Sequence, residues 1–169
     1  MQNKTDFRAK AKIIRKELEF ETISKKLCKK ILQLEEFQKA SNVLLFHPLK
    51  YEVNTLSLIS EDKNFYLPRV NGNDLEICLY KNGDKLCTSC FNVLEPITKG
   101  VCGEILDIII LPALMADKHN YRLGYGKGFY DRFISKTNAI TILPIPKELI
   151  VEKLPTEPHD KKVDIIITV

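Results

Sequence analysis

The segment Ile105–Leu111 constrains the fold most strongly, because isoleucine dominates it and Pro112 closes it. Short apolar runs rich in β-branched residues and bounded by turn residues are typical of buried strands. Similar runs recur along the chain. We predict strands at Val43–Phe46, Phe65–Leu67, Leu75–Tyr80, Ile105–Leu111, Ala139–Leu143 and Val163–Thr168, with Asn71–Asn73 as a turn between the second and the third.

The first forty residues have a helical periodicity instead. Two apolar stripes recur at spacings of three and four residues, which places each on one face of a helix. The stripes are Phe7, Ala11, Ile14 and Leu18, followed by Ile23, Leu27, Ile31 and Leu34. A break between the two helices is expected near Glu21–Thr22, and shorter helices are expected at Asn54–Ile59 and from Gly128 to Ser135.

Strands that alternate with helical segments predict the α/β class. We expect a layered α/β sandwich with a largely parallel, Rossmann-like sheet. The length of 169 residues fits a single domain that covers residues 1–169. Ligands of such folds gather at the carboxyl ends of the strands.

The composition favours a globular protein that is not inserted in a membrane. Apolar residues make up 44% and charged residues 28% of the chain. The longest apolar stretch, Ile108–Ala116, is interrupted by Pro112 and falls well short of the ~20 residues that span a bilayer. Met1–Arg8 is polar and lacks the apolar core of a signal peptide, so we expect a cytoplasmic protein.

Basic residues are concentrated in residues 1–30, which hold ten lysines or arginines against four acidic residues. Such a segment could meet an anion such as nucleotide phosphate, polyglutamate or nucleic acid, or it could form a solvated helix face. No aromatic residues interleave with the lysines as they would in a stacking platform for single-stranded nucleic acid.

Five cysteines without a secretory signal favour free thiols in a reducing compartment. Cys87 and Cys90 form a CxxC pair, and Cys78 and Cys102 could complete a four-thiolate zinc site. Because the outer two cysteines are single, free thiols are the preferred interpretation.

The segment Arg122–Asp131 carries three glycines at alternate positions. Such spacing frees the backbone to adopt positive φ and to direct successive N–H groups at one anion. Arg122, Lys127 and the start of the predicted helix add positive charge. We interpret the segment as a polyphosphate cradle, beside which Asp131 could hold Mg²⁺.

The alternative is a glycine-rich turn without a ligand, a frequent meaning of glycines at such spacing. The flanking charged residues favour the phosphate cradle. The spacing differs from both the P-loop and the dinucleotide-binding fingerprint, and an ordinary Rossmann cofactor is therefore disfavoured.

The longer run from Leu111 to Arg132 is similar to the signature of the 5-formyltetrahydrofolate cyclo-ligases. Other segments resemble that family in the same order along the chain, so that the similarity covers nearly its whole length. These segments are Lys4–Arg8, His47–Thr55, Leu67–Arg69, Leu94–Pro96 and Leu154–Asp164.

The resemblance implies roles for individual residues, with Lys127 and Arg122 as the catalytic pair. ATP would be bound by Lys4, Arg8, Arg122, Leu123, Gly124, Tyr125, Gly126, Lys127, Gly128, Phe129 and Tyr130. The substrate would contact His47, Glu52, Tyr125, Gly126, Lys127, Gly128 and Phe129. Mg²⁺ would be held by Asp131 and Asp164.

The reaction that the resemblance implies is ATP-dependent cyclisation of 5-formyltetrahydrofolate to 5,10-methenyltetrahydrofolate, with release of ADP and phosphate. It would pass through a phosphorylated formyl group, an imino-phosphate. The expected partners are therefore ATP, Mg²⁺ and the folate, with or without a polyglutamate tail, and neither nucleic acid nor a membrane. We expect a monomer.

Two other functions remain open at this point. One is a non-catalytic protein of the same fold that binds a nucleotide or a phosphosugar. It would keep Lys127 and the glycines without needing Asp131 and Asp164 together. The other is a nucleic-acid-binding module that uses residues 1–30, with a steep salt dependence of binding.

Overall fold

The structure, a computed structural model, describes residues 3–169, so the expected polar segment Met1–Arg8 lies partly outside them. The helices are α1 (Lys4–Lys16), α2 (Phe20–Leu32), α3 (Glu35–Lys39) and α4 (Phe129–Ile134), with 3₁₀ turns η1 (Leu56–Ser60), η2 (Gly103–Ile105) and η3 (Lys147–Leu149). The strands are β1 (Asn42–Leu44), β2 (Asn64–Asn71), β3 (Asp74–Leu79), β4 (Leu86–Thr88), β5 (Leu94–Pro96), β6 (Gly100–Val101), β7 (Ile108–Ile110), β8 (Met115–Asp117), β9 (Arg122–Leu123), β10 (Ile140–Pro144), β11 (Ile150–Val151) and β12 (Ile165–Ile167).

Within the described residues, seven strands form the main sheet in the order β12-β10-β7-β1-β2-β3-β6. The first five run parallel to one another, while β3 and β6 are antiparallel to their neighbours. This topology confirms the predicted α/β class with a largely parallel sheet. Two smaller sheets, β11-β8-β9 and β4-β5, complete the fold.

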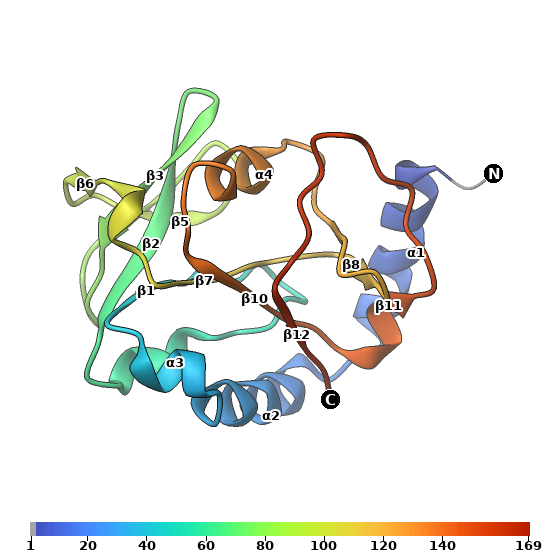
Figure 1. The fold of residues 1–169 in the computed structure, drawn as a ribbon, viewed down its shortest axis with the longest axis horizontal. Helices are drawn as coiled ribbons and strands as arrows, with labels where there is room; N and C mark the ends of the chain where they lie inside the picture. The colour runs from blue at the N-terminus through green and yellow to red at the C-terminus, as the bar shows by residue number, and fades with distance from the viewer. Residues whose placement is uncertain (1–2) are drawn as a thin grey trace.

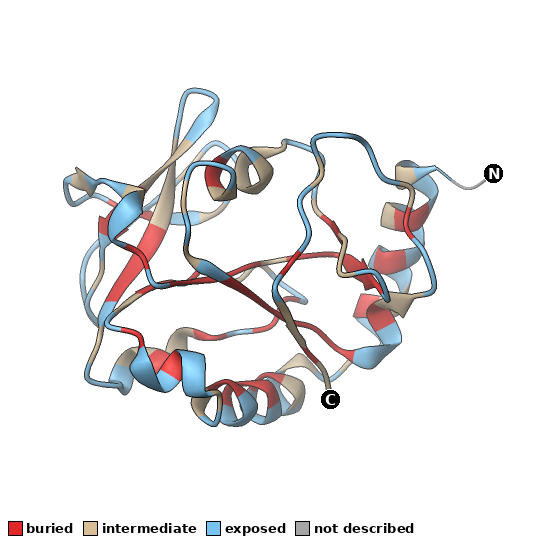
Figure 2. Cartoon of the chain, in the orientation of Figure 1, coloured by how far each residue is buried: buried red, intermediate tan, exposed pale blue. Residues whose placement is uncertain are grey.

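Successive side chains of the central strands point into two hydrophobic cores, one on each face of the sheet, as the period of a strand requires. Leu44, Ile109 and Leu143 belong to the core that contains residues of α1 and α4. Their neighbours Val43, Ile108 and Ile142 belong to the core that contains residues of α2 and α3. Figure 1 shows α2 and α3 along one side of the sheet, and Figure 2 shows the buried strands between the helical layers.

The predicted break between the first two helices was wrong, since α1 ends at Lys16 and α2 already begins at Phe20. The reason is a buried arginine in the last turn of α1. Arg15 donates from Nη1 to the carbonyl oxygens of Ala113 at 2.9 Å and Leu114 at 3.2 Å, and its guanidinium lies 5.2 Å from the Phe20 ring centroid. The chain turns between Arg15 and Phe20 to make this contact.

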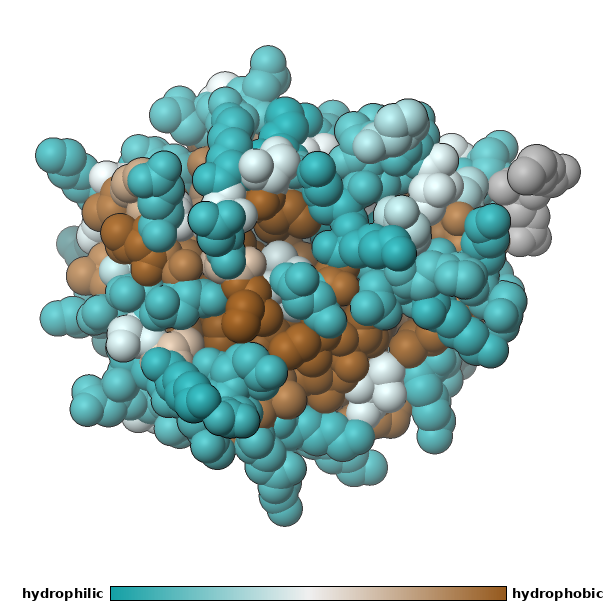
Figure 3. All heavy atoms as spheres, in the orientation of Figure 1, coloured by the Kyte–Doolittle hydropathy of each residue, from teal (hydrophilic) through white to brown (hydrophobic). Residues whose placement is uncertain are grey.

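Two other predicted boundaries also differ. The expected strand Ile105–Leu111 forms only at its centre, because Asp107 accepts hydrogen bonds from the backbone N–H groups of Ser41 and Asn42, both at 2.8 Å. The final strand begins at Ile165 and forms the outer edge of the sheet. In the view of Figure 1, Figure 3 shows hydrophobic atoms across the middle of the molecule, where β10 and β12 lie.

None of the helices within residues 3–169 combines the length and the apolar character that crossing a bilayer requires.

The buried carboxylate of Asp117, only 1% exposed, connects two segments that are distant in sequence. Its Oδ1 accepts from the backbone N–H groups of His119 at 2.9 Å and Tyr121 at 3.0 Å, inside the turn between β8 and β9. Its Oδ2 accepts from Leu154 N at 2.9 Å, in the segment after β11. The first segment leads into the glycine-rich loop, and the second leads to residues 157–161.

Replacing Asp117 with alanine removes the acceptor of three backbone N–H groups at once. Because unpaired buried polar groups are costly, we expect Asp117→Ala to lower the free energy of unfolding by about 2–4 kcal/mol. Urea denaturation measures this value. Asp84→Ala is the matched control, since exposed Asp84 accepts a single side-chain hydrogen bond, from Lys81 N. Equal losses in the two variants would contradict a special role for Asp117.

Candidate active site

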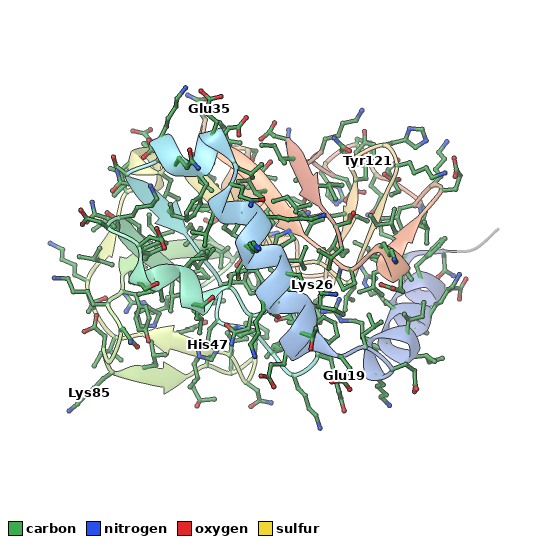
Figure 4. The ribbon with its side chains drawn as sticks, turned by 90° about the horizontal axis from the view of Figure 1, so that it is seen from below. Glu19, Lys26, Glu35, His47, Lys85 and Tyr121 are labelled. Carbon is green, nitrogen blue, oxygen red and sulfur yellow. The ribbon has the colours of Figure 1, made fainter. Side chains whose placement is uncertain are left out.

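A cavity of about 910 Å³ opens beside the carboxyl ends of the parallel strands. Phe46 and His47, which follow β1, and Pro112, which follows β7, form part of its wall. The remaining wall comes from the start of α1, the β2–β3 pair, the β4–β5 hairpin, the glycine-rich loop and residues 157–161. In Figure 4 the labelled His47 lies on the same side of the molecule as this hairpin.

The glycine-rich loop has the backbone conformation that its sequence predicts. Gly126 has φ +99° and Gly128 has φ +67°, values that L-residues with a side chain rarely adopt. A Cβ on Gly126 would lie 3.2 Å from Nη2 of Arg8. Arg8 also donates from Nε to the carbonyl oxygen of Gly124 at 3.0 Å. The loop and the first helix therefore meet with no space for a side chain at position 126.

Arg132 fixes the other end of this loop. Its Nη1 donates to the carbonyl oxygen of Lys127 at 3.1 Å, and its Nε donates to that of Asn73 at 2.9 Å, in the turn between β2 and β3. A Cβ on Gly128 would lie 2.8 Å from the same Nη1. The loop is thus held between α1 on one side and the β2–β3 turn on the other.

The tip of the β4–β5 hairpin lies against the loop. The ring of Phe91 meets that of Phe129 edge to face, with centroids 5.6 Å apart. The ammonium of Lys127 lies 5.8 Å from the Phe91 centroid, within the range of a cation–π contact. The hairpin therefore forms one side of the cavity.

Arg122 and Asp131 form a largely buried ion pair at the base of the loop. Arg122 Nη1 lies 3.0 Å from Asp131 Oδ1, and the same oxygen accepts from Lys161 N at 3.2 Å. The Nε of Arg122 is buried without a hydrogen-bond partner. Asp131 Oδ2 has no hydrogen-bond partner within residues 3–169. The pair thus leaves one carboxylate oxygen available to a ligand.

Lys4 lies between two carboxylates of the C-terminal part of the chain. Its Nζ is 2.6 Å from Glu157 Oε2 and 2.7 Å from Asp160 Oδ2. Burial alone would lower the pKa of Lys4, but its hydrogen bonds to Asp160 and Glu157 reverse this effect and raise it. Burial likewise opposes ionisation of Asp160, yet the hydrogen bond from Lys4 lowers its pKa overall. All three groups are therefore charged at neutral pH.

Asp164, predicted as a magnesium ligand together with Asp131, does not line this cavity. Its Oδ2 accepts from Thr141 N at 2.8 Å and from Thr141 Oγ1 at 2.7 Å, which fastens β12 to β10 at their starts. The aspartate that does share the cavity with Asp131 is Asp160, four residues earlier. Asp160, Glu157 and His159 also form a cluster whose possible ligand atoms lie within 4.8 Å of one another.

Buried Glu52 and the partly exposed Tyr125 form a hydrogen-bonded pair in another part of the cavity. Glu52 is 6% exposed, and its carboxylate accepts from Leu49 N at 2.7 Å and from the Tyr125 hydroxyl. Burial, assisted by the charge of Glu52, raises the pKa of Tyr125 and also that of Tyr130. Burial lowers the pKa of His47, so this imidazole is neutral near pH 7.

The cysteines do not form a shared centre. Cys78 is buried, while Cys87, Cys90 and Cys102 are exposed. The one cluster of potential metal ligands found within residues 3–169 contains no cysteine. The structure therefore gives no support to the four-thiolate zinc alternative.

The structure brings most of the predicted site residues into one cavity, namely Lys4, Arg8, His47, Glu52 and the whole run Arg122–Asp131. Sequence reasoning missed Phe91, Glu95, Glu157 and Asp160 as members of the cavity wall. Glu95 and Asp160 both lie in segments that resemble the family, and that was the available signal. Phe91 has no comparable signal, because its position depends on how the β4–β5 hairpin folds over the loop.

Comparisons with known proteins identify the family of the chain. The model of the 5-formyltetrahydrofolate cyclo-ligase family matches residues 2–169. A probable 5-formyltetrahydrofolate cyclo-ligase of Schizosaccharomyces pombe is 29% identical to the chain, over 84% of this chain and 81% of its own length. The enzyme of that name from Haemophilus influenzae is 30% identical over 76% of each chain.

Two solved structures have the same fold. The 5,10-methenyltetrahydrofolate synthetase of Aquifex aeolicus superposes with a TM-score of 0.87 at 31% identity, covering 98% of this chain and 89% of its own. A synthetase from Mycoplasma pneumoniae gives a TM-score of 0.78 at 20% identity and covers 98% of both chains, which shows the shared fold alone. Since the family model spans nearly every residue, the chain belongs to the 5-formyltetrahydrofolate cyclo-ligase family.

Proposed function

We propose that this protein catalyses the ATP-dependent cyclisation of 5-formyltetrahydrofolate to 5,10-methenyltetrahydrofolate, with release of ADP and phosphate. The observation that carries the proposal is a single cavity in which a positive-φ glycine loop, basic side chains and an apolar wall meet. Family membership supports the same reaction.

The polar end of the cavity suits a nucleoside triphosphate. Lys4, Arg8 and Lys127 all reach this end, and the loop backbone between Gly124 and Gly128 can bring N–H groups close to phosphate oxygens. Because Arg8 lies so close to Gly126, the loop has no room for a side chain at this position. We infer that these residues bind ATP.

The donor set at this end also suits Mg²⁺, which prefers carboxylate oxygens and water. Asp131 has an oxygen without a protein partner, and Asp160 lines the same cavity. We therefore propose Asp131 and Asp160 as the residues that hold the metal ion. When bound, Mg²⁺ neutralises charge on the polyphosphate.

The chemistry needs positioning and charge neutralisation more than a protein nucleophile. Transfer of the γ-phosphoryl group to the formyl oxygen converts that oxygen into a leaving group, and N10 of the same folate then attacks the formyl carbon as phosphate departs. Lys127 and Arg122 would stabilise the negative charge on the transferred group. Glu52 and Tyr125, already hydrogen-bonded to each other, would hold the folate.

The direct test mixes the purified protein with 5-formyltetrahydrofolate and Mg-ATP and follows the ultraviolet absorbance of the conjugated methenyl product. We expect an absorbance increase that requires both ATP and Mg²⁺. Folded protein that binds ATP without any absorbance change would contradict the proposal and would favour a non-catalytic nucleotide-binding protein.

Lys127→Ala should raise the KM for ATP and lower kcat while the protein stays folded. The side chain is exposed, and losing one charge-assisted contact should weaken ATP binding by about 10- to 100-fold. Steady-state kinetics and a thermal melt measure both effects. Unchanged kinetics would show that Lys127 does not contact the nucleotide.

Gly126→Val should be more damaging than Lys127→Ala. A β-branched residue does not readily adopt φ +99°, and its Cβ would meet the Arg8 guanidinium. We expect no measurable turnover and weaker nucleotide binding by calorimetry. Wild-type activity in this variant would mean that no ligand approaches the loop backbone.

Asp160→Asn should raise the Mg²⁺ concentration needed for half-maximal activity, because a metal ligand loses its charge. Asp164→Asn is the matched control. Its carboxylate bonds Thr141 outside the cavity, so we expect a lower melting temperature in metal-free buffer and an unchanged Mg²⁺ requirement. The reverse pattern would assign the metal to Asp164. Magnesium titrations of both variants, with parallel melts, distinguish the two outcomes.

A further inference from the structure

Glu95, on β5, is a buried acid in the cavity wall whose role the proposed reaction leaves unassigned. The side chain is 7% exposed. Its Oε1 accepts a hydrogen bond from Val70 N on β2 at 3.2 Å. Its Oε2 has no hydrogen-bond partner within residues 3–169. This oxygen is not fully buried, and it therefore stays accessible to a ligand.

The other acidic side chains of the cavity are already engaged. Glu52 receives two hydrogen bonds, from a backbone N–H and from a tyrosine hydroxyl. Asp131 is paired with Arg122, and Glu157 and Asp160 are paired with Lys4. Among the residues that the structure describes, Glu95 is the acidic cavity residue that has neither a cation nor a hydroxyl group on its carboxylate.

The arginine next to Glu95 on β2 attracts its charge but donates no hydrogen bond to it. Arg69 directs Nε and Nη2 to Glu76 Oε2, at 3.1 and 2.8 Å, and Nη1 to the carbonyl oxygens of Pro96 and Thr98, both at 2.9 Å. These hydrogen bonds go to Glu76 on β3 and to the backbone just after Glu95. A buried carboxylate without a hydrogen-bonded cation is unfavourable unless N–H donors from a bound molecule approach it.

The surroundings of Glu95 indicate the shape of that molecule. Apolar side chains line the adjacent wall, namely Pro68, Val70, Leu75, Val93 and Leu94. Apolar walls with one polar group suit a flat ring that is held on its faces and oriented at its edge. The ligand chemistry that fits is a flat heterocycle with adjacent N–H donors on one edge.

We propose that Glu95 recognises the pteridine ring of the folate by accepting hydrogen bonds from its adjacent N3–H and 2-amino groups. This inference rests on the proposed function and deepens it. A carboxylate matches two neighbouring N–H donors with its two oxygens, and charge assistance makes such bonds strong. The reacting N5 belongs to the other ring of the pteridine, so anchoring at Glu95 turns the formyl group away from β5. The glycine loop lines the same cavity as Glu95, and its Lys127 and Phe129 contact Phe91 at the tip of the same hairpin.

Glu95→Gln tests the inference, since it keeps the shape of the side chain and an acceptor for Val70 N but removes the charge. We expect the KM for 5-formyltetrahydrofolate to rise by about 10- to 100-fold, with the KM for ATP unchanged. Glu76→Gln is the control, because Glu76 pairs with Arg69 on the neighbouring strand and does not line the cavity. A purely structural Glu95 would instead lower the melting temperature and leave the folate KM as in the wild type, which would overturn the inference.

A ligand change identifies the contact itself. A 5-formyltetrahydrofolate analogue with a methyl group in place of the 2-amino group should bind the wild type about 10-fold or more weaker, and the Glu95→Gln variant with a much smaller difference. Equal losses in both proteins would overturn the proposed contact. Calorimetric binding also separates the two proposals. Folate binding without ATP-dependent turnover would contradict the proposed function alone, whereas no folate binding by the wild type would overturn both.

Discussion

The site depends on the buried carboxylate of Asp117, which accepts hydrogen bonds from three backbone N–H groups. This carboxylate holds the β8–β9 turn against the segment that begins at Leu154. The β8–β9 turn leads into the glycine-rich loop and Asp131. The segment that begins at Leu154 leads to Glu157–Lys161. The later pairing of Asp131 with Lys161 N is possible because both segments leave the same point in fixed directions.

The first helix completes the cavity from the opposite side. Arg15 anchors its last turn to backbone carbonyls of the loop after β7, while Arg8 and Lys4, nearer its start, contact the glycine loop and the C-terminal acids. A single helix therefore combines a buried structural arginine with two basic residues that face the site. This arrangement explains the positions of three of the ten basic residues in residues 1–30.

Much of the fold could be predicted from local pattern, because each central strand is a short β-branched run whose neighbours alternate between two cores. Helix boundaries could not, since the turn after Arg15 depends on carbonyl groups almost one hundred residues away. In the candidate site, the positive φ of Gly126 could be predicted from the alternate spacing of the glycines. Which of Asp160 and Asp164 lines the cavity could not be predicted, because Thr141, a partner on another strand, engages Asp164. Glu95 gave no chemical signal of its own, since only the pairing of β4 with β5 and the packing on β2 place it in the wall.

The contact between Lys4 and Asp160 joins residues that are 156 positions apart. During synthesis on the ribosome, the basic helix emerges first and its acidic partners emerge only after the sheet strands between them. Lys4 therefore has neither of its acidic partners until residues 157–160 have left the ribosome. A nascent chain can build its sheet from the earlier strands before this end of the cavity is complete, so that folding of the scaffold and maturation of the site become separate events in time.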